Sequence, residues 1–246
     1  MRDDLLDAQA AIDWAVTQIP ILQNVFFEWC KKHPYKIVKE FDPQYGGYVF
    51  VAYPDGTFAL IHNAWVGAII NSLRSSLDSL AAALARRNGN KPNAETHFPI
   101  FASEQDMIDP LTGIEGKKWL SKGERAAVKA LKPYKGGDDT IWPLHQLDIV
   151  RKHERLICAT VDVRRFHVET GNMMVSGFAG IERLKDKTIL SGAGGPNPLD
   201  MAESYTHIAA HITFNEADLG LADHEVATTL SRFASRVAEI IERFDA

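Results

Sequence analysis

The sequence predicts an α+β fold in which a helical layer around one central helix, about residues 63–87, packs with an antiparallel β-sheet and a C-terminal amphipathic helix. Apolar residues recur every three or four positions in the long segments, which is the periodicity of amphipathic helices. Between residues 156 and 215, apolar and polar residues alternate instead, as in a sheet with one solvent-exposed face. We find no repeat and no clear linker, and therefore expect a single domain, with a helix-rich half at about 1–154 and the sheet and last helix at about 155–246.

The composition is that of a globular protein with an ordinary core. Of the 246 residues, 46% are hydrophobic and 24% are charged, and the net charge of −5 argues against a general electrostatic grip on nucleic acid or anionic lipid. The N-terminus is acidic and predicts no signal peptide, and the longest uncharged run, residues 56–73, carries too many polar groups for a membrane span. The two cysteines, Cys30 and Cys158, form no CxxC pattern and suit a reducing compartment. We expect a cytoplasmic protein without a cofactor.

The first part of the chain predicts a helix followed by a hairpin. Residues 3–33 carry one apolar stripe, which Pro20 interrupts with a kink or a fresh start and which Pro34 ends. Residues 35–41 and 48–53 then predict two strands joined by a turn rich in glycine and proline.

The central helix is the best-defined element. Asn63 is the expected N-cap, and Gly89 marks the end. The segment has so few charges that we expect it to be covered on more than one side. One flank consists of small residues, which let a second element approach closely and invite a partner: Ser72, Ser76, Ser79 and Ala83.

The rest of the chain alternates between loops, helices and strands. Residues 90–140 are irregular, with a short helix at 122–131, and Pro143 opens a helix that reaches Glu154. Strands are expected at 156–168, 173–183, 188–190 and 205–215. Asp223 is expected to cap the C-terminal helix.

Two polar sets on the predicted helices are the candidate sites. On the central helix, Arg74 and Asp78 are four residues apart and meet on one flank, as an ion pair that needs further partners if it is buried. On the helix after Pro143, one face carries His145, Asp148 and Lys152. That face offers a titratable imidazole, a carboxylate that orients it and a cation for an anionic group. A solvent-exposed face with an Asp148–Lys152 pair explains the same pattern.

These segments resemble an uncharacterised family of bacterial proteins. Its members carry, in order, a helix similar to "HNLRSALDHL", a "FPIF" segment, a "PY" segment and a helix ending in "KHR". This chain matches with residues 71–80, 97–101, 132–134 and 144–155, including His153. The resemblance covers roughly residues 1–160, implies a bacterial source and brings no established activity.

The central helix is also similar to the Arg-x4-6-His motif of HEPN ribonucleases. In those proteins the pair lies in a helical bundle, often at a dimer interface, and cleaves RNA without a metal ion. Here the arginine is Arg74, but Ser79 stands where the histidine is expected. A histidine from elsewhere, His145 or His153, replaces it only if the two helices pack together.

Two further patterns are weak. His207 and His211, with Glu203, would share one face of a helix and hold zinc, but their neighbours alternate as in a strand. In a strand, residues four apart are separated by about 13 Å, which is too far for one metal ion. The glycine-rich stretch 191–198 lacks the Gly-Lys-Ser/Thr ending of phosphate-binding loops.

The missing motifs favour a non-enzymatic binding or interaction protein that forms a homo-oligomer or binds a protein partner. The alternative is a metal-independent ribonuclease, or a degenerate relative of one, with RNA as its partner. That alternative predicts that Arg74, Asp78 and either His145 or His153 lie within about 4–6 Å of one another.

Overall fold

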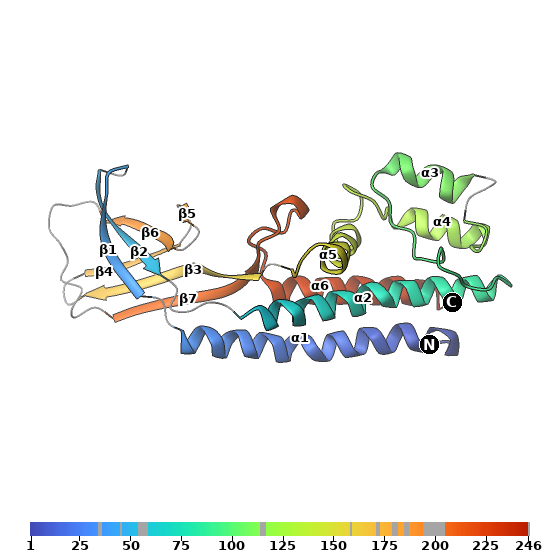
Figure 1. Ribbon diagram of the computed structural model, residues 1–246, viewed down its shortest axis with the longest axis horizontal. Helices are drawn as coiled ribbons and strands as arrows, with labels where there is room; N and C mark the ends of the chain where they lie inside the picture. The colour runs from blue at the N-terminus through green and yellow to red at the C-terminus, as the bar shows by residue number, and fades with distance from the viewer. Residues whose placement is uncertain are drawn as a thin grey trace. The chain divides into compact units, whose positions relative to one another are not determined.

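The computed structural model divides the chain into two compact units, drawn in Figure 1. It describes residues 1–245 except 34–35, 45, 54–58, 114–116, 158, 171–172, 179–181, 185–186 and 194–204. The helical unit consists of Met1–Leu22, Leu60–Cys158 and Phe214–Ala246. The strand unit consists of Gln23–Ala59 and Ala159–Thr213. The expectation of a single domain stays a prediction.

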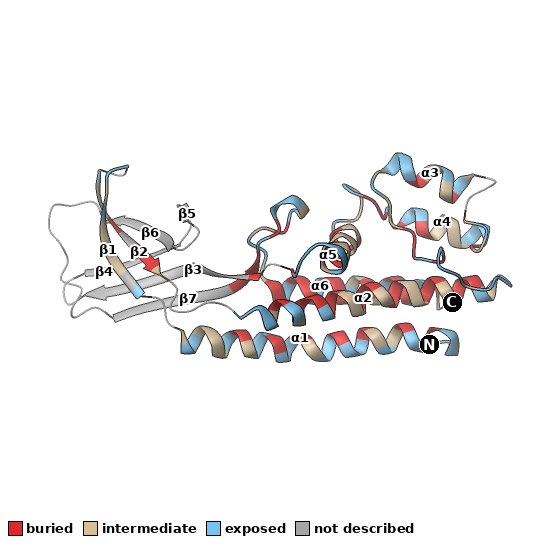
Figure 2. Cartoon of the chain, viewed as in Figure 1, coloured by how far each residue is buried: buried red, intermediate tan, exposed pale blue. Residues whose placement is uncertain are grey.

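The helical unit is built around helix α2 (Leu60–Arg87), which contacts α5 (Ile141–His153) and α6 (Val226–Arg243). The other elements of this unit are η1 (Asp3–Leu5), the first part of α1 (Leu6–Lys32), α3 (Glu104–Thr112), α4 (Lys122–Ala130) and η3 (Ala217–Leu219). Figure 2 shows that buried residues dominate α2, whereas α1 and α6 alternate between buried and exposed positions. The expected coverage of α2 on several sides is therefore confirmed.

The sequence predicted the C-terminal end of α2 correctly but not its N-terminal end. Gly89 adopts a left-handed φ of +74°, and the N–H of Asn90 donates to the carbonyl of Ala85 at 2.9 Å, which closes the helix as expected. The expected N-cap is wrong, because α2 begins at Leu60 and Asn63 lies buried inside it. Leucine and isoleucine at the preceding positions continue a helix readily, so a capping residue further along does not set the boundary.

The small-residue flank of α2 is covered by α1 of the same chain. The hydroxyl of Ser76, which is 0% exposed, donates to the carbonyl of Ala8 at 2.9 Å, and Ser72 donates to the carbonyl of Ala11 at 2.9 Å. Small side chains thus allow close approach, as expected, but the element that approaches belongs to this chain. This flank no longer argues for an oligomer.

Helix α1 runs from Leu6 to Lys32 without a break at Pro20, so of the two alternatives at this proline the fresh start is wrong. Proline removes one helical hydrogen bond, to the carbonyl four residues earlier. Because Pro20 and Val16 are both exposed, water reaches that carbonyl. The expected end before Pro34 is confirmed.

The far end of α2 is tied to both chain ends by Arg87. Its guanidinium binds the Asp4 carboxylate through two contacts of 2.5 and 2.8 Å and donates to the carbonyl of Phe244 at 2.6 Å. The hydrogen bond from Arg87 lowers the pKa of Asp4 below its ordinary value. Helix α2 therefore fixes η1 and the end of α6 together.

Helix α6 buries the predicted stripe, including Leu230, Phe233 and Val237. The expected cap is wrong, because Glu225 is the N-cap and Asp223 adopts a left-handed φ of +68°. The N–H of Asp223 donates to the carbonyl of Phe214 at 3.0 Å, so this residue belongs to the turn before the helix.

The strand unit holds two sheets over the described residues, with strand orders β1-β2-β6-β5 and β4-β3-β7. The hairpin of β1 (Lys36–Asp42) and β2 (Gly47–Tyr53) is antiparallel, with Val38 opposite Val51, as the sequence predicts. Three later strands also lie close to their expected ranges: β3 (Ala159–Thr170), β6 (Lys187–Ala193) and β7 (Tyr205–Phe214). The single strand expected at 173–183 is wrong, because β4 (Met173–Phe178) and β5 (Glu182–Leu184) are separate and belong to different sheets.

The predicted fold class is nevertheless wrong. It placed the central helix and the C-terminal helix in a layer packed with an antiparallel sheet. In the structure, α2 is covered by helices, α6 belongs to the helical unit, and the strands form a separate unit. Alternation identifies strands but does not say what their buried face covers.

None of the described helices is both long and apolar enough to cross a membrane.

The connection between α2 and α5 is more ordered than predicted. Helix α4 confirms the expected short helix and carries a capping box of Ser121 and Glu124. Helix α3 was not predicted, although Ser103 caps it by accepting from the N–H of Asp106. A parallel bridge pairs Phe101, before α3, with Tyr134, after α4.

Ser76→Ala should lower the free energy of unfolding by about 1 kcal/mol relative to Ser75→Ala, because only Ser76 loses a buried hydrogen bond. Ser76→Arg should cost about 3 kcal/mol or more, since it forces a charge between α1 and α2. Urea denaturation followed by circular dichroism measures both. Equal stability of Ser76→Ala and Ser75→Ala would contradict the intrachain packing.

Candidate functional site

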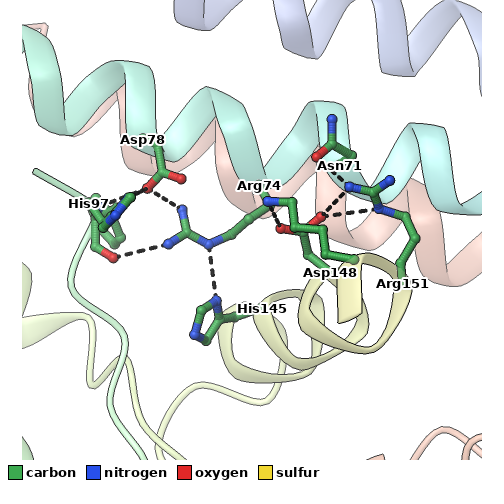
Figure 3. A network of polar contacts seen from close by, with 9 residues as sticks. Asn71, Arg74, Asp78, His97, His145, Asp148 and Arg151 are labelled. Atoms are coloured by element: carbon green, nitrogen blue, oxygen red, sulfur yellow. Dashed lines mark hydrogen bonds and ion pairs between the residues drawn. The ribbon is translucent and has the colours of Figure 1, made fainter. Parts of the chain in front are cut away.

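Two of the candidate residues, Asp78 on α2 and His145 on α5, meet at the guanidinium of Arg74 (Figure 3). Arg74 is only 4% exposed, and each of its three nitrogens donates to an internal acceptor. Nε donates to Nδ1 of His145 at 3.2 Å, Nη1 to Asp78 at 2.6 Å, and Nη2 to the carbonyl of Phe98 at 3.3 Å. One buried side chain thus joins α2, α5 and the segment before α3.

Asp78 holds that segment from the other side. Its Oδ1 accepts from Arg74 and from the backbone N–H of Phe98, the latter at 2.9 Å. Nδ1 of His97 lies 3.8 Å from the same oxygen, and this ring is 62% exposed. The i,i+4 pair predicted from the sequence is therefore confirmed, and Phe98 supplies the further partners that a buried pair requires.

The hydrogen bond from Arg74 determines the protonation of His145. An arginine does not lose its protons in a protein, so its Nε–H is always the donor and His145 Nδ1 must accept. The imidazole is then neutral, with its proton on Nε2. Burial, followed by the charge of Arg74, lowers the pKa of His145 from 6.5 to about 4. Asp148 and Asp78 oppose this shift but do not cancel it.

Asp148 forms a second buried centre one turn further along α5. It is 3% exposed, and its carboxylate binds Lys152 at 2.5 Å and Arg151 at 3.2 Å. Nη2 of Arg151 also donates to Oδ1 of Asn71 on α2 at 2.7 Å. Asp148 therefore pairs with Lys152, as the sequence allowed, but the carboxylate is buried and does not belong to a solvent-exposed face.

Gly67 makes room for Arg151, and the sequence analysis missed both residues. A Cβ atom on Gly67 would lie 2.7 Å from Cδ of Arg151 and 3.0 Å from its Cγ. The side chain of Arg151 thus crosses α2 where the helix has no side chain of its own. The signal available in the sequence was a glycine four residues before Asn71 in an otherwise apolar helix.

We call these seven residues the Arg74 cluster: Asn71, Arg74, Asp78, His145, Asp148, Arg151 and Lys152. The cluster pairs its two carboxylates with three cations, and its histidine is neutral. Its contacts are directed inward, between elements of the helical unit. This is the arrangement of a buried polar network that orients helices.

Several sequence candidates lie outside the cluster. His153 is exposed, and eight residues along α5 separate it from His145, a rise of about 12 Å. Ser79 is half-buried and leaves the Arg-x4-6-His pattern without its histidine. Arg155, just after α5, pairs with the buried Glu216 at 2.8 Å.

The other weak motifs lie in or near the strand unit. His207 and His211 are both in β7, which confirms the strand and argues against a shared zinc ion, and their side chains are not described. Most of the glycine-rich stretch, like Cys158, lies outside the described residues. Burial raises the pKa of the Cys30 thiol. Within the described part of the chain, no three His, Cys, Asp or Glu side chains gather at a metal site.

No protein-family model, curated protein or solved structure matches the chain. The resemblances to the uncharacterised bacterial family and to HEPN ribonucleases stay predictions.

The low pKa of His145 predicts a specific acid sensitivity. Because the folded-state value of about 4 lies below the ordinary 6.5, the unfolded chain binds the proton first as the pH falls. The contribution of His145 to stability should be complete above about pH 6.5 and decline toward pH 4. His145→Gln, which keeps an acceptor for Arg74, should lose less stability over this range. Urea titrations at several pH values measure the difference, and parallel curves would contradict the assignment.

Gly67→Ala should destabilise the fold although alanine favours helices. The new methyl group displaces Arg151, which then loses Asn71 and Asp148, at a cost of about 1–3 kcal/mol against a propensity gain of about 1 kcal/mol. In an Arg151→Ala background the same substitution should be neutral or stabilising. A double-mutant cycle in urea tests this coupling, and additive effects would rule it out.

Proposed function

We propose that this chain is a non-enzymatic binding protein and that the Arg74 cluster is its internal frame. One observation carries the proposal: every nitrogen of the Arg74 guanidinium donates to an acceptor within the chain, and the side chain is only 5% exposed. A catalytic arginine has to reach the charge that develops on a substrate. Arg74 instead reaches His145, Asp78 and the backbone of Phe98.

The state of His145 supports the same proposal. A general base needs an unprotonated ring nitrogen that faces the substrate. Nδ1 of His145 already accepts from Arg74, and Nε2 carries the proton. A general acid needs a pKa near the working pH, whereas burial lowers that of His145 to about 4. The ring is suited to positioning.

A second candidate, metal-independent RNA cleavage related to the HEPN ribonucleases, is favoured by one specific observation. Arg74 lies 3.2 Å from His145 and 2.6 Å from Asp78, so both contacts of the arginine fall within the distance that this alternative requires. Catalysis would need Arg74 to release His145 and turn outward. That movement would leave the Asp78 carboxylate and the Phe98 carbonyl without their partner, at a cost of several kcal/mol.

The proposal also covers the cellular compartment and the partners of the protein. Sparse cysteines outside any CxxC pattern support a reducing compartment, and we propose the bacterial cytoplasm. A protein partner or a homo-oligomer fits a binding protein, and RNA is a partner only under the ribonuclease alternative. Light scattering of the wild type tests the oligomer directly.

We expect labelled single-stranded RNA to stay intact with the wild-type protein in the presence of EDTA. Arg74→Met and His145→Gln should leave RNA equally intact, while Arg74→Met lowers the free energy of unfolding by about 3–5 kcal/mol, because it removes the cation paired with Asp78 and the donor to His145 and to the carbonyl of Phe98. His153→Ala, which changes an exposed residue outside the cluster, is the matched control. RNA cleavage by the wild type that His145→Gln abolishes in a folded protein would overturn the proposal.

A further inference from the structure

The helical unit contains a cavity of about 410 Å³ at the start of α5, outside the Arg74 cluster. Its walls come from the loop before α5, from Trp142 in the first turn of α5, and from the turn 218–221. Arg232 of α6 also reaches it. This volume is in the usual range for a small-molecule site.

The loop wall is ordered by its own backbone. The N–H of Gly137 donates to the carbonyl of Tyr134 at 2.9 Å, and that of Asp138 donates to Lys132 at 2.8 Å. A Cβ on Gly137 would lie 2.4 Å from the carbonyl oxygen of Lys132, so only glycine fits this turn. The wall is therefore formed in advance of any ligand.

Asp138 is fully engaged and does not face a ligand as a free charge. Its Oδ1 accepts from the backbone N–H groups of Thr140 and Ile141 at 2.9 and 2.7 Å, which caps α5. Its Oδ2 lies 2.9 Å from both Nε and Nη2 of Arg236. The cavity's cations Lys135 and Arg232, by contrast, have no acidic partner among the described residues.

The apolar part of the lining centres on the indole of Trp142, with Leu219, Leu221 and Pro143. Nζ of Lys135 lies 5.2 Å from the ring centroid, in a cation–π contact. The indole N–H is buried with no partner in the described chain, so no hydrogen bond ties the ring to one orientation. The ring can therefore change its orientation to fit a ligand without losing a hydrogen bond.

We propose that this cavity binds a small organic anion with a flat apolar body. The body lies against Trp142, and Lys135 leaves the indole to pair with the carboxylate or phosphate of the ligand beside Arg232. A cationic ligand is disfavoured because Lys135 already occupies the cation position over the ring. The remaining acids of the lining, Asp139 and Asp218, are exposed, as are Lys135 and Arg232, so water screens all four charges. The preference for an anion comes from Lys135, which lies over the ring against which the ligand's body packs. This inference rests on the proposed binding function and names its ligand class.

Saturation-transfer NMR and calorimetry with simple probes test the inference on the full chain. Benzoate and phenyl phosphate should bind with a Kd on the order of 1 mM, as expected for fragments of this size. Tighter binding of benzoate would indicate a carboxylate ligand, and tighter binding of phenyl phosphate would indicate a phosphate ligand. Benzylamine, which has the same ring and the opposite charge, should bind at least tenfold more weakly, and so should inorganic phosphate, which has no ring.

Matched variants locate the binding. Lys135→Ala and Arg232→Ala should each weaken benzoate and phenyl phosphate by about tenfold, or 1.4 kcal/mol. Lys129→Ala and Arg243→Ala remove exposed cations of the same kinds elsewhere and should change nothing. Trp142→Leu should abolish the ring contact. The Lys135 and Arg232 variants carry the test if Trp142→Leu does not fold.

Tighter binding of benzylamine, no binding of either anion at 10 mM (about ten times the expected Kd), or loss of affinity in the control variants would overturn the inference. These outcomes are separate from those of the RNA experiment. Intact RNA together with a negative probe panel removes the cavity site and leaves the proposed binding function standing. RNA cleavage that depends on His145 removes the proposed function whatever the cavity binds.

Discussion

The arrangement of the helical unit depends on the burial of one guanidinium. A charged group taken out of water costs several kcal/mol unless paired and hydrogen-bonded, and Arg74 is 4% exposed. Its partners come from three places in the chain: Asp78 on α2, His145 on α5 and the backbone of Phe98. Any packing that separates these segments leaves the charge unsatisfied, so the cluster specifies one packing of α5 on α2 and excludes others that the apolar stripes alone would allow.

Asp148 adds a constraint that Arg74 alone does not impose. His145 and Asp148 are three residues apart on α5 and therefore lie on one face of that helix. Because the first meets Arg74 and the second is joined to Asn71 through Arg151, α5 is held to α2 at two successive turns. Two contacts fix the rotation of a helix about its own axis, where one would not. Gly67 is part of this constraint, since only an absent side chain lets Arg151 cross α2.

The sequence predicted which residues share one face of a helix, but it did not predict which elements pack against each other. Helical periodicity placed Arg74 with Asp78 and His145 with Asp148, but it does not say which helix covers which. The serines of α2 correctly predicted a close approach, whereas the occupant, α1, depends on tertiary packing. The same limit explains the error in fold class, because alternating residues identify strands without identifying the layer they cover. Asn63 and Asp223 failed as caps because neighbouring backbone structure set the helix boundaries.

Helix α5 links the Arg74 cluster to the cavity. Trp142 and His145 are three residues apart, so the wall of the cavity and the contact to Arg74 lie on successive parts of one helix. Asp138 caps that helix and is itself held by Arg236 of α6, which fixes its first turn from the other side. A preorganised binding site has a higher affinity, because its residues lose less conformational entropy when the ligand binds. If the cavity binds a ligand as proposed, the buried charges of α5 support its wall, because they hold this helix against α2 while Trp142, in the first turn of the same helix, lines the cavity.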